Sequence, residues 1–361
     1  MGIFLNATLV SFVTVVLVIP VIIVFSKNKY LLDQPDNYRK LHSGPTPTMG
    51  GFAIFLGIFF SSTIFSSFYS SSQQITLLLL SSLVILLLGI IDDMFQLSPL
   101  KKIIGQLLVV VILIFFLDIR IDRMYGLLGI DYIPVYVSML VTMFTILVIV
   151  NGFNLIDGVD GLAGVLGFIA ATFLGVYFYV DSQYVYSILS FALAGSIFGF
   201  LIFNFSPAKI FLGDGGSMFI GLILAILTIR FIVSAPLSTK FSIQDSPAVG
   251  FGLLAIPLLD TLRVFIIRLS RGLSPFSPDR NHIHHMLQDL GFSHILISLS
   301  LGAYSIIILL MSWVISLKFT CTFAIFSIGL LYYISVLFIY LLRKNRSNST
   351  TKVFSINQER A

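Results

Sequence analysis

The dominant feature of the sequence is a series of long apolar segments separated by short polar loops. A helix that crosses a bilayer needs about 20 apolar residues, and the 361-residue chain carries about eleven such segments. They lie at 3–25, 50–69, 74–91, 103–118, 133–151, 161–180, 184–203, 217–235, 248–267, 294–316 and 319–342. With 57% hydrophobic and 10% charged residues, the composition is that of a lipid-embedded chain. The sequence predicts an all-α, polytopic integral membrane protein with about eleven transmembrane helices.

The loops leave no room for a separate soluble domain. We therefore expect a single transmembrane domain over 1–342 and a basic cytoplasmic tail over 343–361. Pro236, Pro247 and Pro257 interrupt the apolar pattern near the eighth and ninth segments. The first segment has no basic residue before it, which favours a retained anchor over a cleaved signal peptide.

The basic residues predict how the chain is oriented in the membrane. If the N-terminus lies outside, fifteen of the 21 Lys and Arg fall in the inward loops and the tail. The positive-inside rule favours this orientation, with the C-terminus in the cytoplasm. The polar motifs then fall in the inward loops 27–49, 92–102, 152–160, 204–216 and 268–293. This segregation favours one cytoplasmic site built from several loops.

The loop NFSPAKIFLGDGGS, from Asn204 to Ser217, combines a cation, a carboxylate and glycines. Lys209 offers positive charge, Asp214 is a hard oxygen ligand, and the glycines let backbone N–H groups approach a ligand at the start of a helix. This combination suits a phosphate and its magnesium ion, although the G-K-[ST] order of a Walker loop is absent. Taken alone, the loop could equally be a turn between two membrane helices.

Two further loops carry clustered aspartates. Asp92 and Asp93 end an apolar segment and precede Lys101 and Lys102. Adjacent carboxylates raise one another's pKa and need a metal, a proton or a cation nearby, so we expect one of them to act as a base. Either lysine could hold the charge of the substrate.

The loop from Asn151 to Gly164 places Asn154, Asp157 and Asp160 at intervals of three, which a helical turn would bring to one face. Asn and Asp with glycine also make turns and helix caps, and Asp160 could cap the next helix. The number of polar groups without a basic partner in the loop favours contact with a nucleotide or a metal.

The last inward loop holds three of the five histidines, His282, His284 and His285, together with Arg280. A zinc site is one interpretation of this spacing. The absence of nearby cysteine and the cationic character of the loop favour a phosphate instead, which imidazole N–H groups and a guanidinium can bind.

These motifs, taken in order, resemble the polyprenyl-phosphate N-acetylhexosamine-1-phosphate transferases of glycosyltransferase family 4. The matching stretches are RKLHSGPTPTMGG, IIDD with a trailing lysine, NLIDGVDGLAG, NFSPAKIFLGDGGS and SPFSPDRNHIHH. The PDR-x-H-x-H-H loop resembles the branch related to undecaprenyl-phosphate N-acetylglucosamine-1-phosphate transferase. Ile283 interrupts the run of three histidines that is usual in the branch that makes the first lipid intermediate of peptidoglycan.

The resemblance implies a Mg²⁺-dependent transfer of N-acetylhexosamine 1-phosphate from a UDP-sugar to undecaprenyl phosphate, with release of UMP; Mn²⁺ can substitute. It implies catalytic Asp92, Asp93, His282 and His284, substrate-binding Lys101, Asn154, Asp157, Asn204, Lys209, Arg280 and His285, and metal-binding Asp214 and Asp160. Lys101 and Lys209 are included for their charge alone. It also implies a bacterial inner-membrane enzyme with a cytoplasmic active site and no nucleic-acid partner, and it is compatible with a homodimer.

A transporter or lipid flippase with an Asp and His proton relay is the alternative class. It predicts ionisable groups spread through the depth of the bilayer and helices broken near Pro257 and Asp260. Only Asp260 and Arg263 lie well inside an apolar segment, where their spacing of three allows them to pair. The clustering of the other polar motifs in the inward loops favours the enzyme.

Overall fold

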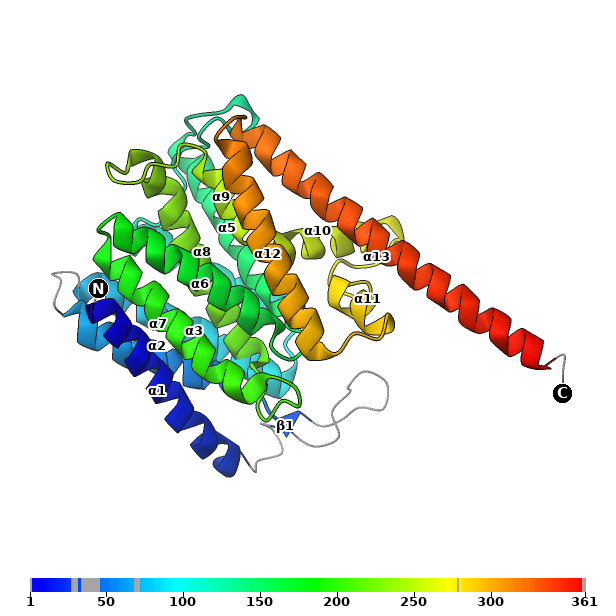
Figure 1. Cartoon of the computed structure of the whole chain (residues 1–361). Helices are drawn as coiled ribbons and strands as arrows, with labels where there is room; N and C mark the ends of the chain where they lie inside the picture. The colour runs from blue at the N-terminus through cyan, green and yellow to red at the C-terminus, as the bar shows by residue number, and fades with distance from the viewer. Residues whose placement is uncertain (1, 27–31, 34–45, 68–71, 278, 359–361) are drawn as a thin grey trace.

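Every apolar segment predicted from the sequence forms helix in the computed structural model of the protein (Figure 1), which describes residues 2–26, 32–33, 46–67, 72–277 and 279–358. The helices are α1 (Gly2–Phe25), α2 (Gly50–Ser66), α3 (Ser72–Phe95), α4 (Pro99–Leu117), α5 (Val135–Ile156), α6 (Leu162–Val180), α7 (Tyr184–Asn204), α8 (Gly213–Ser234), α9 (Ser246–Leu253), α10 (Ala255–Ser270), α11 (Ile283–Asp289), α12 (His294–Ser316) and α13 (Cys321–Gln358). Two short 3-10 turns, η2 (Leu127–Gly129) and η3 (Ala235–Leu237), and one antiparallel pair of two-residue strands, β1 (Leu32–Asp33) and β2 (Thr46–Pro47), complete the described elements.

Within the described residues, nine helices are long and apolar enough to cross a membrane, namely α1, α3 to α8, α12 and α13. The prediction of a polytopic, all-α membrane protein is therefore confirmed. Helix α2 has 17 residues, which is shorter than the predicted segment 50–69.

The ninth segment differs from its prediction, because 248–267 is not one straight helix. Helices α9 and α10 meet at a bend of 76°. Leu254, between them, has φ −110° and ψ 14°, outside the helical range. Pro257 lies in the first turn of α10, where its missing N–H costs no helical hydrogen bond. Figure 1 shows α10 lying across the direction of α12, on the same side of the molecule as α11.

Helix α8 is the buried centre of the bundle. It packs against α2, α3, α5, α6 and α9, and it is apolar on nearly all sides, as a helix surrounded by other helices must be. Glycines allow the closest approaches. A Cβ at Gly51 would come within 2.1 Å of the Cα of Gly216, and a Cβ at Gly89 within 2.4 Å of the Cα of Gly215. The start of α8 is thereby held against the end of α3 that carries Asp92 and Asp93.

Backbone hydrogen bonds fix the loop that precedes α8. The N–H groups of Gly50 and Gly51 donate to the carbonyls of Phe211 and Leu212, at 2.9 and 3.0 Å. The N–H of Phe211 donates to the carbonyl of Pro47 at 2.7 Å. The loop and the N-terminus of α2 therefore form one unit, whose position follows from main-chain atoms.

Helix α13 continues past the predicted boundary at residue 343 without a break. No glycine or proline occurs between residues 330 and 358, so nothing in the sequence ends the helix there. Figure 1 shows its C-terminal part projecting beyond the rest of the bundle.

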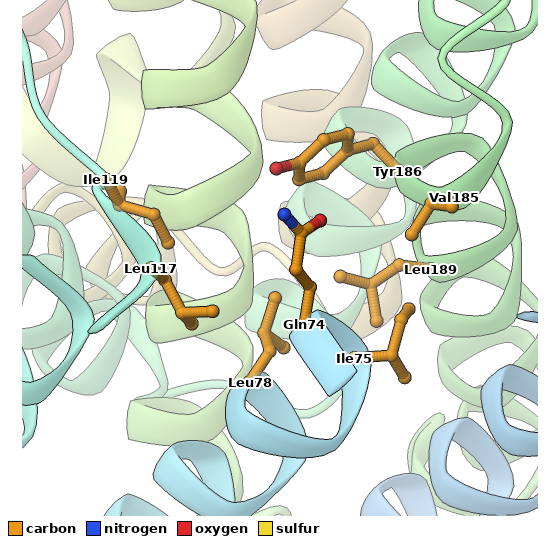
Figure 2. Close-up of a pocket in the computed structure, with 8 residues that line it drawn as sticks. All are labelled: Gln74, Ile75, Leu78, Leu117, Ile119, Val185, Tyr186 and Leu189. Carbon is orange, nitrogen blue, oxygen red and sulfur yellow. The ribbon is translucent and has the colours of Figure 1, made fainter. Parts of the chain in front are cut away.

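A small cavity of about 20 Å³, room for about one water molecule, lies among the first turns of α3 and α7 and the end of α4 (Figure 2). Gln74 and Tyr186 are the polar members of a lining otherwise made of apolar side chains. Because Asp92 and Asp93 lie at the opposite end of α3, this cavity is separate from the polar loops.

The glycine contacts predict a position-dependent effect of adding one methyl group. Gly89→Ala should lower the free energy of unfolding by about 1–3 kcal/mol, because the new Cβ collides with the backbone of α8. Gly329→Ala, where nothing lies within 4 Å, should leave it unchanged or raise it by about 1 kcal/mol. Thermal unfolding in detergent measures both variants. Equal stability of the two would contradict the packing described for α3 and α8.

Candidate active site

The centre of the candidate site is the ammonium group of Lys102, which contacts three other helices. Its Nζ lies 2.7 Å from Oδ2 of Asp92 at the end of α3 and 3.0 Å from Oδ2 of Asp214 at the start of α8. It also donates to Oδ1 of Asn154 near the end of α5, at 2.9 Å. The amide of Asn154 in turn donates to Oδ1 of Asp214 at 2.8 Å and to Oγ of Ser217 at 3.0 Å. Four helix ends therefore converge on one polar cluster.

The turn between α3 and α4 explains how Lys102 reaches Asp92. The N–H of Leu97 donates to Oδ1 of Asp92 at 2.7 Å, and Gln96 takes a positive φ of 48°. Helix α4 then starts at Pro99, a residue suited to the first helical position. Ten residues after Asp92, the chain has reversed and returns Lys102 to the same carboxylate.

The structure distinguishes Lys102 from Lys101, the lysine that the sequence analysis selected on charge alone. Lys101 is exposed, whereas Lys102 turns into the cluster. Lys102 lies one helical turn before Gln106, which is buried and exchanges hydrogen bonds with Asn151. Gln106, a polar residue within an apolar segment and four positions after Lys102, is the sequence signal that could have identified Lys102 as the inward-facing lysine.

Asp93 has a different environment from its neighbour. Its Oδ1 accepts the N–H of Asp214 at 3.0 Å, as a carboxylate at a helix N-terminus does. Within the described part of the chain, its buried Oδ2 has no hydrogen-bond partner. A buried acceptor without a partner is costly, and binding a proton would remove that cost. Oδ2 of Asp93 is therefore the oxygen that can take a proton.

The third polar loop is not the helical turn that the spacing of its polar residues predicted. Helix α5 ends at Ile156, so Asn154 is helical while Asp157 and Asp160 lie in the turn that follows. Burial raises the pKa of Asp157 to about 8, and the negative charges of Asp214, Asp93 and Asp160 add to the shift. Asp157 therefore keeps its proton at neutral pH in the folded protein.

Asp160 points to a partner that the sequence analysis did not select. Its Oδ2 lies 3.1 Å from Nδ1 of His294, the first residue of α12. His294 Nε2 lies 3.1 Å from Nε2 of Gln288, and Gln288 Oε1 lies 3.0 Å from Nδ1 of His285. The third loop is thus connected to the histidine helix α11, a link that sequence spacing could not reveal.

Asn204 and Lys209 do not point into the cluster. The buried amide of Asn204 accepts the N–H of Gly161 at 2.8 Å and donates to the carbonyl of Ile210 at 2.9 Å. Asn204 therefore joins the third and fourth polar loops, while Lys209 is exposed. Their roles in substrate binding stay predictions. In the first inward loop, 27–49, residues 27–31 and 34–45 lie outside the described residues.

The histidines at α11 have three different environments. His282 is buried and lies 2.7 Å from Asp260, on α10. His284 is also buried, and a Cβ at Gly158 would come within 2.3 Å of its Nε2. Burial, with a smaller effect of His285, lowers the pKa of His284 to about 3, so this ring is neutral at neutral pH. Burial also lowers the pKa of His285.

Two arginines lie near this histidine segment. Arg268 is buried and pairs with Asp279 at 3.0 Å, while Arg280, the residue predicted to bind a diphosphate, is exposed and lies 3.4 Å from Asp289. The close contact of His284 with Gly158 places the segment on the third loop. The histidines and the carboxylate cluster therefore border the same loop from two sides.

The donor set suits a magnesium ion that is completed by substrate. Among the described residues, no three Asp, Glu, His or Cys side chains converge as a ready-made ligand cage. Magnesium is usually held by one or two carboxylates together with phosphate oxygens and water. Asp214 is a carboxylate of this kind. A divalent cation nearby would oppose the burial and the neighbouring negative charges that together raise the pKa of Asp157.

Known proteins resemble this chain over most of its length. A probable undecaprenyl-phosphate N-acetylglucosaminyl 1-phosphate transferase of Bacillus subtilis (strain 168) is 32% identical over 295 residues, covering 80% of this chain and 78% of the relative. A decaprenyl-phosphate N-acetylglucosaminephosphotransferase of Mycobacterium leprae is 31% identical, covering 71% and 70%. An undecaprenyl-phosphate alpha-N-acetylglucosaminyl 1-phosphate transferase of Escherichia coli (strain K12) is 29% identical, covering 74% and 72%.

The family model for glycosyl transferase family 4 matches residues 75–232, the stretch that carries the whole cluster from Asp92 to Asp214. The same residues supply the converging helix ends of α3, α4, α5 and α8. With this match and a relative 32% identical over 78% of its length, the chain belongs to glycosyl transferase family 4.

Proposed function

We propose that the protein transfers N-acetylhexosamine 1-phosphate, with N-acetylglucosamine 1-phosphate as the best candidate, from a UDP-sugar to undecaprenyl phosphate. The products are UMP and a polyprenyl-diphosphate sugar, the first lipid-linked intermediate of a cell-envelope polysaccharide. The observation that carries the proposal is the cluster of Asp92, Asp93 and Asp214 around the ammonium of Lys102 at one end of a membrane bundle. The activities for which the relatives from three bacteria are named support the same reaction.

The reaction requires two anionic substrates to meet. A phosphate oxygen of the lipid attacks the sugar-linked phosphorus of the UDP-sugar, a new P–O bond forms, and the bond to the UMP oxygen breaks. Lys102 supplies positive charge where the two phosphates approach. Because Asp92 is occupied by Lys102 and Leu97 while Oδ2 of Asp93 has no partner among the described residues, we assign Asp93 as the base that takes the proton of the lipid phosphate.

Asp214 would hold a Mg²⁺ ion together with substrate phosphates, and Asp160 is the second candidate ligand. The ion would neutralise charge that develops on the phosphate oxygens. Asp157, in the third loop, is our candidate for contact with the nucleotide. Asn154 hydrogen-bonds to both Asp214 and Lys102 and so holds their side chains in place. His282 and His284 remain assigned to the catalytic site, and His285 and Arg280 to diphosphate binding.

We further propose that the protein lies in a bacterial inner membrane and that its site faces the cytoplasm, the compartment in which UDP-sugars are made. The positive-inside rule supports this orientation, since fifteen of the 21 Lys and Arg lie in the inward loops and the C-terminal tail. A homodimer is compatible with this arrangement. The transporter alternative receives little support, because Asp92, Asp93, Lys102 and Asp214 meet at helix ends and Asp260 is paired.

The proposal is tested by UMP release from purified protein in detergent. With undecaprenyl phosphate, Mg²⁺ and a panel of UDP-N-acetylhexosamines, we expect UMP from UDP-N-acetylglucosamine. Because phosphate charge would be left without its counter-ion, EDTA should abolish the release and added Mg²⁺ or Mn²⁺ should restore it. Omission of the lipid is the control, and it should give no UMP. Failure of every donor with folded protein would refute the function and favour flux assays for a transporter.

The two adjacent lysines give a matched pair of variants. Lys102→Gln should lower kcat/KM by about 10² to 10³-fold, because it removes the charge shared by Asp92 and Asp214. Lys101→Gln removes an equal charge from an exposed position and should change kcat/KM by less than about threefold. Steady-state UMP release measures both. A larger loss with Lys101→Gln would contradict the assignment of Lys102.

The raised pKa of Asp157 predicts how the free energy of unfolding depends on pH in metal-free buffer. Between the unfolded pKa of about 3.9 and the folded pKa of about 8, the folded state keeps a proton that the unfolded state has lost. The free energy of unfolding should therefore fall as pH rises through this window, and Asp157→Asn should flatten the fall. Thermal midpoints in EDTA from about pH 5 to about pH 8.5 measure the slope. Parallel curves for the two proteins would contradict this assignment.

A further inference from the structure

Asp260 is a buried carboxylate that the transfer reaction, as described above, does not use. Its side chain is 0% exposed, and donors from three elements surround it. Oδ1 accepts from Arg263 on α10 at 2.7 Å, from the N–H of Ile283 on α11 at 3.0 Å, and from the hydroxyl of Tyr332 on α13 at 3.1 Å. Oδ2 lies 2.7 Å from Nδ1 of His282.

These contacts define the protonation of the His282 ring. A carboxylate paired with a guanidinium and two further donors acts only as an acceptor, so Nδ1 of His282 must carry the hydrogen. On the other side of the ring, NH2 of Arg268 lies 3.5 Å from Nε2. Arg268 can only donate. The ring that fits both neighbours is neutral, with the hydrogen on Nδ1 and a lone pair on Nε2.

Asp260 also fixes the start of the helix that carries the other histidines. His282 occupies the N-cap position of α11 but makes no capping hydrogen bond with its side chain. Oδ1 of Asp260 accepts the first N–H of the helix in its place. The ring of His282 lies nearly parallel to that of His284, with centroids 5.5 Å apart, and His284 faces Gly158 of the third loop. The carboxylate of Asp260 thus fixes both the orientation of the His282 ring and the position of the first turn of α11 beside the site.

We propose that Asp260 is a positioning residue for sugar-phosphate transfer, which holds His282 in the tautomer that presents the Nε2 lone pair beside Arg268. The kinetic part of this inference rests on the proposed function. A carboxylate with only a structural role would need no more than its pairing with Arg263 and its hydrogen bond to the first N–H of α11. The additional contact with His282 Nδ1 selects one tautomer of a histidine within the site.

The variant Asp260→Asn separates the two roles. Its carbonyl oxygen can still accept from Arg263, Ile283 and Tyr332, while its NH2 then faces Nδ1 of His282 and drives the hydrogen to Nε2. We expect kcat to fall on the order of 10²-fold, with KM changed by less than about threefold. Tyr332→Phe is the matched control, because it removes one hydrogen bond from Asp260 without changing the tautomer, and it should keep kcat within about threefold.

A double-mutant cycle tests whether Asp260 acts through His282. His282→Ala alone should lower kcat by a similar factor, and Asp260→Asn should cost no further activity in its presence. Additive losses, or an unchanged kcat in Asp260→Asn, would overturn the proposal.

The ¹⁵N chemical shifts of the histidine rings in the wild-type protein give a readout that depends neither on activity nor on the folding of Asp260→Asn. We expect a protonated Nδ1 and an unprotonated Nε2 for His282, with the signal assigned by its loss in His282→Ala. A hydrogen on Nε2 in the wild type would overturn the inference. If wild-type protein releases no UMP from any donor, the proposed function fails, while the ring nitrogens still decide whether Asp260 sets the tautomer.

Discussion

The site depends on one ammonium group shared by carboxylates from two helices. Asp92 and Asp214 approach Lys102 from α3 and α8. Asp93, also on α3, accepts the N–H of Asp214 at the start of α8. Without Lys102, three negative charges would face one another at a poorly solvated end of the bundle, where unpaired charge is costly. The same ammonium donates to Asn154 and thereby ties in α5. The cluster is therefore both a local electrostatic balance and the point at which four helices are joined.

The close packing of α8 makes that balance geometrically available. Hydrogen bonds near 3 Å between helix ends require backbones that approach more closely than ordinary side chains permit, and Gly51, Gly89, Gly215 and Gly216 provide the approach. Lipid offers no hydrophobic force between helices, so this contact and the polar cluster support each other. A substitution that separates α3 from α8 therefore affects stability and chemistry together, which is why Gly89 and Lys102 belong to one account.

Sequence reasoning identified the features that depend on local pattern. Apolar length predicted the nine described helices that are long enough to cross a membrane, but not α11, which lies in a predicted loop. Residue type predicted that Asp92, Asp93, Asn154 and Asp214 carry the chemistry, and the structure brings these four together.

What it missed depends on geometry across the fold. Pro257 indicated an interruption of the ninth segment, but not the position of the break at Leu254 or the 76° angle between α9 and α10. Lys101 and Lys102 have the same charge, and only the face of α4 separates them. The contacts of Asp160 with His294 and of Asp260 with His282 join residues too distant in sequence for spacing to reveal them.

The central claim, that the phosphates meet at the carboxylate cluster, is tested most directly by a structure of the protein with UDP-N-acetylglucosamine and Mn²⁺, in which anomalous scattering locates the ion. We predict the ion beside Asp214, with the diphosphate between it and Lys102. An ion bound at the histidines of α11, with the nucleotide away from Lys102, would contradict the account.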